Sequence, residues 1–291
     1  MNHNHQLYLQ ALLELVDVKA IRTRKFKVLT DPVNGTVCEL SVELLERLGC
    51  EVVKHNCDLN QLPQRAPEPR AKSLVQTAAK VVTEKCDLGV GFDMDADRVL
   101  FIDEIGEVLS EDLSGAILGK AELKRPEDVC VTPLNSSGIF KKVIEAAGGK
   151  VAESLVGPPE IIEMIKKKRA VFGYEETGKY FFSRYFIWAD GLLASMKMLQ
   201  ILAKTSQTLS QIRLQYPKYF QVKLAFNCAF EKMPKRWVGK GEKMIFSDSW
   251  LFIRGSGTEP IIRIFTDSPS LETAKQLAEK GKRIVEKACA G

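Results

Sequence analysis

The sequence lacks the features that direct a protein into a membrane or along the secretory route. Its 291 residues contain no uninterrupted stretch of about 18 apolar residues, the length that a membrane-spanning helix needs. Residues 1–6 (MNHNHQ) are unlike the start of a secretory signal, which is basic and then apolar. We therefore expect a cytoplasmic protein with no membrane partner.

Histidine is scarce and the cysteines are not paired, which excludes several kinds of metal and redox site. Only three histidines occur, and two of them lie within the first five residues. His55 is therefore the one candidate for imidazole chemistry, and we interpret it as a solvated loop residue. Seven cysteines are scattered without the two-residue spacing of zinc or redox motifs, so we expect reduced and mostly buried thiols.

The positive charge is too dispersed to indicate binding to nucleic acid. The formal net charge of +5 is spread along the chain. The one dense run, residues 166–169 (KKKR), follows a helical pattern and suits a helix C-terminus, where cations interact favourably with the helix dipole. We therefore expect no nucleic-acid partner.

Composition and patterning indicate an α/β protein of several units. With 45% hydrophobic and 27% charged residues, a chain of this length can form two or three compact cores. Strand patterns alternate with helix patterns, which is typical of parallel or mixed sheets. We predict two consecutive α/β units with mixed sheets followed by a smaller α+β C-terminal domain. The predicted bounds are a residual N-terminal helix at 1–24 and units at 25–125, 126–218 and 219–291.

The expected elements follow from hydrophobic periodicity and turn residues. Strands are expected at 26–30, 51–54, 87–92, 99–102, 128–132, 150–152, 170–174, 221–227, 243–246, 250–254 and 261–266. Helices are expected at 7–21, 37–48, 71–84, 111–121, 137–147, 159–168, 190–203 and 271–288. The first helix carries too many leucines and valines to lie free in water, so it should pack against the first unit or against another copy of the chain.

Three carboxylates at alternate positions follow the strand expected at 87–92. Asp93, Asp95 and Asp97 would repel one another unless a cation or several donors lay among them, and Asp oxygens favour Mg²⁺ or Ca²⁺. An EF-hand fits poorly, because Arg98 occupies the position that needs Gly and a strand follows at once. A polar turn with its charges in water remains the alternative.

Two further loops carry groups suited to a sugar phosphate. Glu175 and Glu176 stand before a Gly and could accept hydrogen bonds from neighbouring sugar hydroxyls, although Glu pairs mostly face water. Residues 254–260 (RGSGTEP) contain two glycines and two hydroxyls. With Arg254 and Arg263 they could form a nest for a phosphate, although a Gly-rich hairpin turn is the plainer interpretation.

In this order, the three loops resemble those of the α-D-phosphohexomutase superfamily, which contains the phosphoglucomutases and phosphomannomutases. Residues 91–98 (GFDMDADR) resemble its metal loop D-G-D-G-D-R, with Met94 and Ala96 in place of glycines. Residues 173–179 (GYEETGK) resemble its sugar loop G-E-x-S-G-H, with Lys179 where the His often stands. Residues 254–260 resemble its phosphate loop R-P-S-G-T-E-P, with Gly255 in place of Pro.

The resemblance implies intramolecular phosphoryl transfer between the 1- and 6-positions of a hexose phosphate or hexose bisphosphate. Mg²⁺ would be the cofactor, bound by Asp93, Asp95 and Asp97. Arg98 and Lys179 would be the candidate catalytic residues. The implied substrate-binding residues are Glu175, Glu176, Thr177, Arg254, Ser256, Gly257, Thr258 and Arg263.

The resemblance covers residues 25–291 and corresponds to the second, third and fourth of the family's four domains. The first domain carries the catalytic serine in a T-A-S-H-N-P type segment, which this sequence does not contain. The nearest segment, residues 135–138 (NSSG), is expected to cap a helix. Three readings stay open: a short mutase that uses a bisphosphate or a separate first-domain chain, a sugar-phosphate binding protein without chemistry, and a fragment of a four-domain mutase. Self-association also stays open.

Overall fold

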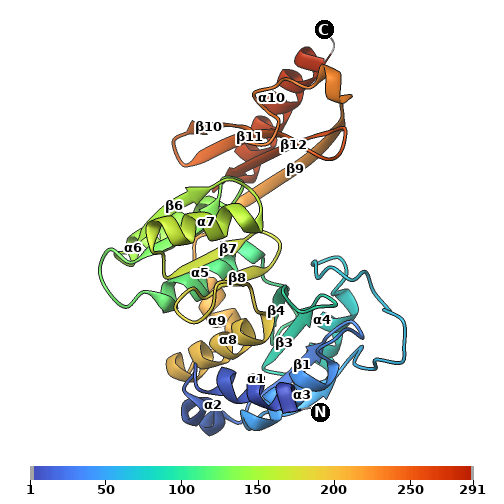
Figure 1. The fold of residues 1–291 in the computed structure, drawn as a ribbon, viewed down its shortest axis with the longest axis vertical. Helices are drawn as coiled ribbons and strands as arrows, with labels where there is room; N and C mark the ends of the chain where they lie inside the picture. Colours follow the sequence, from blue (N-terminus) through green and yellow to red (C-terminus); the bar gives the residue numbers. More distant parts are fainter. Residues whose placement is uncertain (1–2, 290–291) are drawn as a thin grey trace.

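The computed structural model describes residues 3–289, which form three four-stranded sheets arranged one after another along the long axis of the molecule (Figure 1). The first two sheets are mixed and carry helices, and the third is antiparallel with one long helix. The predicted fold class is therefore confirmed. No helix among the described residues is both long enough and apolar enough to cross a membrane.

The first sheet presents its functional loops at the carboxyl ends of parallel strands. Its strands are β1 (Lys27–Asp31), β2 (Glu51–Lys54), β3 (Leu88–Phe92) and β4 (Val99–Asp103), in the order β2-β1-β3-β4 with only β4 antiparallel. Helices α3 (Cys38–Arg47) and α4 (Val75–Thr83) contact β1 and β3 respectively. Every residue of β3 is buried. Gly89 leaves room for Val81 of α4, and Gly91 leaves room for Leu74, the residue before that helix, because an added Cβ at either would lie 2.5 Å from a side-chain atom.

The second sheet has the same layout. Its strands are β5 (Val129–Pro133), β6 (Lys150–Ser154), β7 (Phe172–Glu175) and β8 (Lys179–Phe181), in the order β6-β5-β7-β8. The helices of this part are α5 (Glu111–Glu122), α6 (Gly138–Ala146), α7 (Pro158–Lys168), α8 (Gly191–Thr205) and α9 (Leu209–Leu214). Ser137 caps α6, as expected for the segment at 135–138. Strand β8 and helix α9 were not predicted.

The third sheet turns one face toward α10 and the other toward the second unit. Its strands are β9 (Phe220–Asn227), β10 (Glu242–Phe246), β11 (Ser249–Gly255) and β12 (Ile261–Ser268), followed by α10 (Leu271–Cys289); a short 3₁₀ helix, η1 (Phe230–Lys232), precedes β10. Trp250, Phe252 and Phe265 pack with Leu134 and Val156 of the second unit. All elements predicted for this unit are present to within two residues at each end.

The single helix predicted at 7–21 is wrong, because the structure contains two helices, α1 (His3–Leu13) and α2 (Val18–Arg24). Asp17 ends the intervening turn: its carboxylate accepts the Ala20 N–H at 3.0 Å, and its own N–H donates to the Gln200 side chain at 2.7 Å. Packing against the first unit is observed, since Leu9 and Leu12 are buried in the same core as Leu44 of α3.

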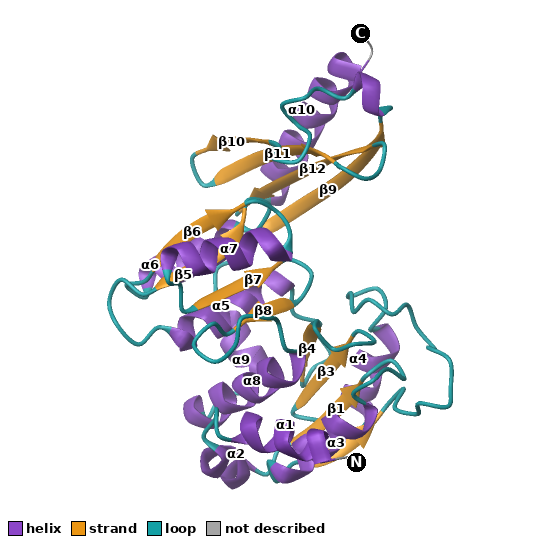
Figure 2. Ribbon diagram, in the orientation of Figure 1, coloured by secondary structure: helices purple, strands orange, loops and turns teal. Residues whose placement is uncertain are grey.

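The helix expected at 71–84 begins only at Val75. Ser73 accounts for the late start, because its hydroxyl accepts the Arg70 N–H at 2.9 Å and donates to the Glu68 carbonyl at 2.8 Å. These local bonds hold the preceding residues in a turn. The resulting loop between β2 and α4 is long and extends away from the sheet (Figure 2).

We expect that Leu12→Ala destabilises the protein by about 2–5 kcal/mol, the usual cost of emptying a buried leucine site. Leu12 is 1% exposed, whereas Leu7 on the same helix is 55% exposed, so Leu7→Ala is the matched control and should change stability by less than about 0.5 kcal/mol. Urea unfolding of both variants measures the difference. Equal and small effects would show that α1 does not belong to the folded core.

Candidate functional site

The turn between β3 and β4 gathers the three predicted metal ligands. One carboxylate oxygen from each of Asp93, Asp95 and Asp97 lies within 4.8 Å of the others. Asp93 is buried and Asp95 is exposed. Ala96 adopts the left-handed conformation (φ 57°), and its N–H donates to the Asp93 carbonyl at 3.3 Å. The family's glycine position is thus filled by a residue that tolerates the same turn at some cost in strain.

Cationic groups partly balance this charge. The Arg98 N–H donates to Asp93 Oδ1 at 3.1 Å and its guanidinium lies 3.4 Å from Oδ2, while Lys179 pairs with Asp97. Burial raises the pKa of Asp93 to about 6, and neighbouring Asp97 and Asp95 add to the rise. Three carboxylates so close together are stabilised by an added positive charge. Their oxygen atoms are also the ligands that Mg²⁺ prefers, so the residues fit this ion.

Two segments distant in sequence fix the backbone of this turn. The Thr36 N–H and hydroxyl donate to the Met94 carbonyl at 2.8 and 3.0 Å. The Gly191 N–H, at the start of α8, donates to the Ala96 carbonyl at 2.9 Å. Gly35 is needed for this approach, because a Cβ there would lie 2.4 Å from the Met94 oxygen.

The predicted sugar loop joins β7 to β8 and lies against the metal turn. Gly178 takes a left-handed conformation (φ 91°), and its carbonyl accepts the Val99 N–H at 3.0 Å. Glu175 is buried, and its Oε2 accepts the Thr177 hydroxyl at 2.7 Å. Lys179 is also buried and carries the loop's contact with Asp97. The structure thus places the candidate catalytic residues Arg98 and Lys179 in contact with the same carboxylate cluster.

Both oxygens of Glu176 are engaged by protein side chains. Asn135 donates to Oε1 at 2.8 Å, and Lys223 of β9 lies 2.5 Å from Oε2. Burial raises the pKa of Glu176, and Lys223 opposes that rise. Glu176 therefore links the second unit to the third, whereas Thr177 is the only described residue whose side chain donates to the Glu175 carboxylate.

The predicted phosphate loop connects β11 to β12. The Ser256 hydroxyl accepts the N–H groups of Thr258 and Glu259 at 3.3 and 3.2 Å, so these donors converge on one point. Gly257 is open to solvent, with no atom within 4 Å of the place where its Cβ would be. The missing side chain leaves space for a small anion beside the loop, and such an anion would have to replace the Ser256 hydroxyl as the acceptor of these two N–H groups.

The strand register places the two arginines of this loop together. Arg254 of β11 is directly opposite Arg263 of β12, which also pairs with Glu259 at 2.6 Å. Burial lowers the pKa of the Arg254 guanidinium and Arg263 adds to the effect, whereas Glu175 opposes it. Arg263 lines the same cavity as Glu176 of the sugar loop.

A cavity of about 850 Å³ lies between the sugar loop and the third sheet. Arg70, Glu111, Glu176, Lys223 and Arg263 contribute to its lining. Arg70 and Lys223 were not predicted as site residues. Lys223 is an isolated base in a strand and carries no local signal, while Arg70, which pairs with Glu111 at 3.0 Å, lies in the loop that precedes α4.

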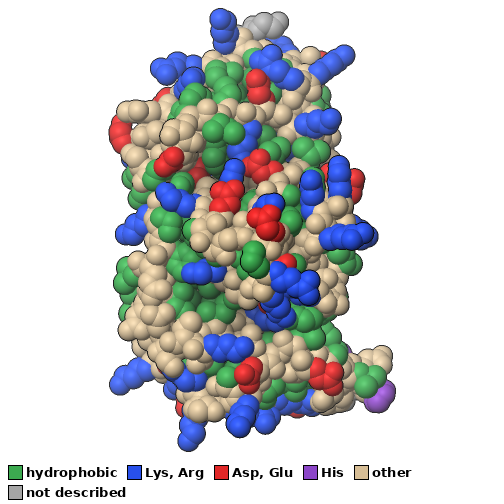
Figure 3. Space-filling view, turned by 90° about the vertical axis from the view of Figure 1, so that its left-hand side faces the viewer, with side chains coloured by type: hydrophobic (Ala, Val, Ile, Leu, Met, Phe, Trp, Pro, Cys, Tyr) green, Lys and Arg blue, Asp and Glu red, His purple; other side chains and the backbone are tan. Residues whose placement is uncertain are grey.

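Basic and acidic side chains are mixed over the visible face of the molecule, and Lys and Arg extend from one end to the other (Figure 3). The face shows no single large basic patch, in agreement with the dispersed charge of the sequence.

Three family models of phosphoglucomutase/phosphomannomutase match successive parts of the chain. Alpha/beta/alpha domain II matches residues 6–106, alpha/beta/alpha domain III matches residues 110–219, and the C-terminal domain matches residues 209–283. A phosphoglucomutase/phosphomannomutase of Thermococcus kodakarensis is 32% identical over 98% of this chain. The chain spans about 66% of the length of the curated relatives that it matches.

Solved structures share the fold at lower identity. A phosphoglucomutase/phosphomannomutase family protein of Burkholderia thailandensis superposes with a TM-score of 0.85 at 20% identity, covering 98% of this chain and 64% of its own. The N-acetylphosphoglucosamine mutase of Aspergillus fumigatus, in complex with GlcNAc-6P and magnesium, gives 0.70 at 17% identity, covering 98% and 66%. The family models, which cover nearly the whole sequence, and the relative that is 32% identical show that the chain belongs to the phosphoglucomutase/phosphomannomutase family.

Proposed function

We propose that this chain binds a hexose phosphate together with Mg²⁺ and serves phosphoryl transfer between the 1- and 6-positions of the sugar. The observation that carries the proposal is that ion pairs join residues of the three sheets. Lys179 joins the sugar loop to the metal turn through Asp97, and Lys223 joins the third unit to the sugar loop through Glu176. Two ion pairs between units therefore connect the metal turn, the sugar loop and strand β9, and the phosphate loop would complete the site from the third unit.

The phosphate of the substrate would bind at Arg254 and Arg263, with Ser256, Gly257 and Thr258 providing hydroxyl and backbone donors. The paired guanidinium groups supply the charge, and their planar forks suit phosphate oxygens. Glu175 and Thr177 would accept and donate hydrogen bonds at the sugar hydroxyls. Glu176 could join them only by exchanging Lys223 or Asn135 for a hydroxyl.

Asp93, Asp95 and Asp97 would hold the Mg²⁺, whose chemistry is to neutralise negative charge at the transferring phosphoryl group. Arg98 and Lys179 flank these carboxylates and would place further positive charge beside the reacting phosphate. The magnesium in the complex of the Aspergillus mutase supports the choice of ion for this chain.

We expect Asp95→Asn to weaken Mg²⁺ binding by at least about tenfold, because it removes one charged ligand. Asp95 is exposed, so the substitution should leave the fold intact. Glu84→Gln, at an exposed carboxylate after α4, removes the same charge and should leave the affinity unchanged. Titration calorimetry with MgCl₂ measures both variants. Equal affinities in wild type and Asp95→Asn would place the ion elsewhere.

Arg263→Ala should weaken binding of glucose 6-phosphate by about tenfold or more, since a charge-assisted hydrogen bond contributes about 1.5–3 kcal/mol. Arg283→Ala is the charge-matched control, because this residue is exposed on α10. Calorimetric titration measures the dissociation constants. The phosphate subsite would have to be reassigned if the Arg263 variant bound as tightly as the control.

Transfer requires a source of the phosphoryl group, whereas binding alone does not. The matched models are those of domain II, domain III and the C-terminal domain, and residues of these three domains would supply the metal, sugar and phosphate contacts. We propose that a hexose bisphosphate, or a first domain of the family, either on a separate chain or in a longer four-domain mutase of which these residues are a part, supplies the phosphoryl group in the cytoplasm. Binding without transfer is the second candidate.

A phosphoglucomutase assay on the purified chain, with and without glucose 1,6-bisphosphate, separates these candidates. We expect glucose 1-phosphate to be converted only when the bisphosphate is present, because it can donate a phosphoryl group and be regenerated. The Asp95→Asn variant should lose this turnover. Binding of glucose 6-phosphate with no turnover under either condition would favour the second candidate.

A further inference from the structure

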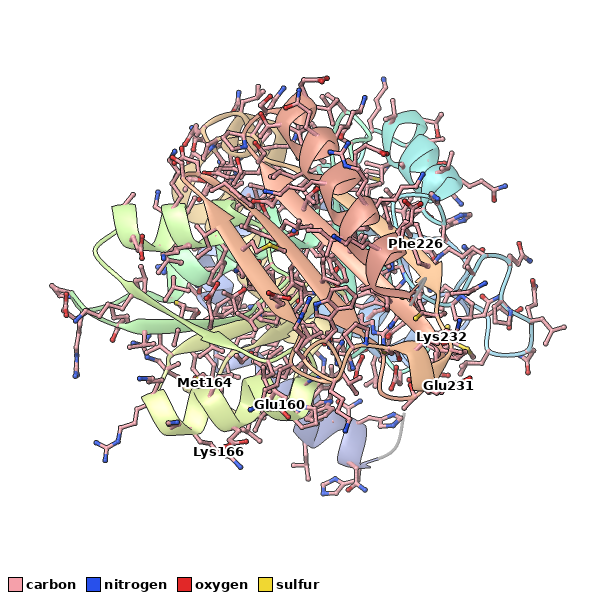
Figure 4. All side chains as sticks on the ribbon, turned by 90° about the horizontal axis from the view of Figure 1, so that it is seen from above. Glu160, Met164, Lys166, Phe226, Glu231 and Lys232 are labelled. Atoms are coloured by element: carbon pink, nitrogen blue, oxygen red, sulfur yellow. The ribbon has the colours of Figure 1, made fainter. Side chains whose placement is uncertain are left out.

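Two cysteines that are far apart in sequence meet in the third unit, at the end of β9. Cys228 directly follows β9, and Cys289 is the last residue of α10. Their sulfur atoms lie 2.7 Å apart. Phe226 and Lys232, which flank Cys228 in sequence, mark this place in Figure 4. The two sulfur atoms therefore face each other, and the distance between them is only somewhat longer than the approximately 2.05 Å of a disulfide bond.

The surroundings of this pair differ from those of the other cysteines. Cys228 is 6% exposed and packs in a core with Met233 and Trp237, whereas Cys289 is partly exposed. Cys38 and Cys57 lie near each other in the first unit, but there the Cys57 thiol donates to the backbone carbonyl of Cys38 at 3.3 Å. The remaining three cysteines, Cys50, Cys86 and Cys130, are buried.

We propose that Cys228 and Cys289 form a reversible disulfide when the protein meets a low-molecular-weight disulfide such as oxidised glutathione. The Cys289 thiolate attacks the reagent, forming a mixed disulfide and releasing one thiol. The Cys228 thiolate then attacks the Cys289 sulfur and releases the second thiol. Two S–H bonds are lost and one S–S bond forms, while the reagent accepts two electrons and two protons.

The order of the two steps follows from exposure. Cys289 is accessible to the reagent, and the buried Cys228 is positioned to resolve the mixed disulfide. Burial and the adjacent Cys228 raise the pKa of Cys289 to about 11. Because the thiolate is the nucleophile, the rate of oxidation should rise about tenfold per pH unit between pH 7 and pH 9.

The bond would act on the phosphate loop. The Cys228 N–H donates to the carbonyl of Pro260, the last residue of that loop, at 2.8 Å. The disulfide would tie the end of α10 to this corner and close a loop that contains all of β10, β11 and β12. Closing so long a loop restricts the unfolded chain, so the oxidised form should melt at a higher temperature. This inference does not rest on the proposed activity.

The test uses the full chain and the Cys289→Ser variant, each treated with oxidised glutathione at pH 8. Free thiols are then alkylated under denaturing conditions, and the peptides are mapped by mass spectrometry. We expect wild type to yield a peptide that joins Cys228 to Cys289, which dithiothreitol reverses. The melting temperature of oxidised wild type should rise by at least about 3 °C, whereas the variant should show no rise.

Two results would overturn the proposal. One is alkylation of both Cys228 and Cys289 in wild type after the treatment, which would show that the pair does not react. The other is a map in which either residue is joined mainly to a different cysteine, including one in a second copy of the chain. Because Cys289 lies at the end of α10, the serine variant should fold, and its unoxidised melting temperature checks this.

Discussion

The crowding of three carboxylates at the end of one buried strand is the constraint on which the site depends. Asp93, Asp95 and Asp97 can lie within 4.8 Å of one another only if positive groups and a fixed backbone offset their repulsion. Arg98 and Lys179 supply the positive groups. The backbone is fixed by hydrogen bonds from Thr36 in the first βα loop and from Gly191 at the start of α8, so segments of two units hold the same turn.

The same contacts explain how separate sheets build one site. Lys179 belongs to the second sheet, yet its ammonium lies on a carboxylate of the first. Lys223 belongs to the third sheet and pairs with Glu176 of the second. The antiparallel register of β11 and β12 sets Arg254 beside Arg263, and Arg263 lines one cavity with Glu176. Charge pairs between units, together with the apolar contacts of Phe252 and Phe265, orient the loops toward one another.

The sequence was sufficient where local chemistry decides the structure. The strands of the third unit follow from alternating apolar residues and turn signals that lie close together in the chain, whereas the three loops were assigned through their resemblance to those of the family. It was insufficient where distant residues decide. The break before α2 depends on Gln200, which bonds Asp17 from 183 residues away. The roles of Lys223 and Asn135 at Glu176 arise only when two sheets meet. A single basic residue in a strand does not indicate from sequence that it forms such a contact.

A crystal structure of the chain with glucose 6-phosphate and Mg²⁺ tests most directly whether the three loops form a single site. The account predicts phosphate on Arg254 and Arg263, sugar hydroxyls on Glu175, and the ion among the three aspartates. A sugar phosphate bound elsewhere, such as among Lys124, Arg125 and Arg169 on the second unit, would contradict it. So would an ion bound away from the aspartates.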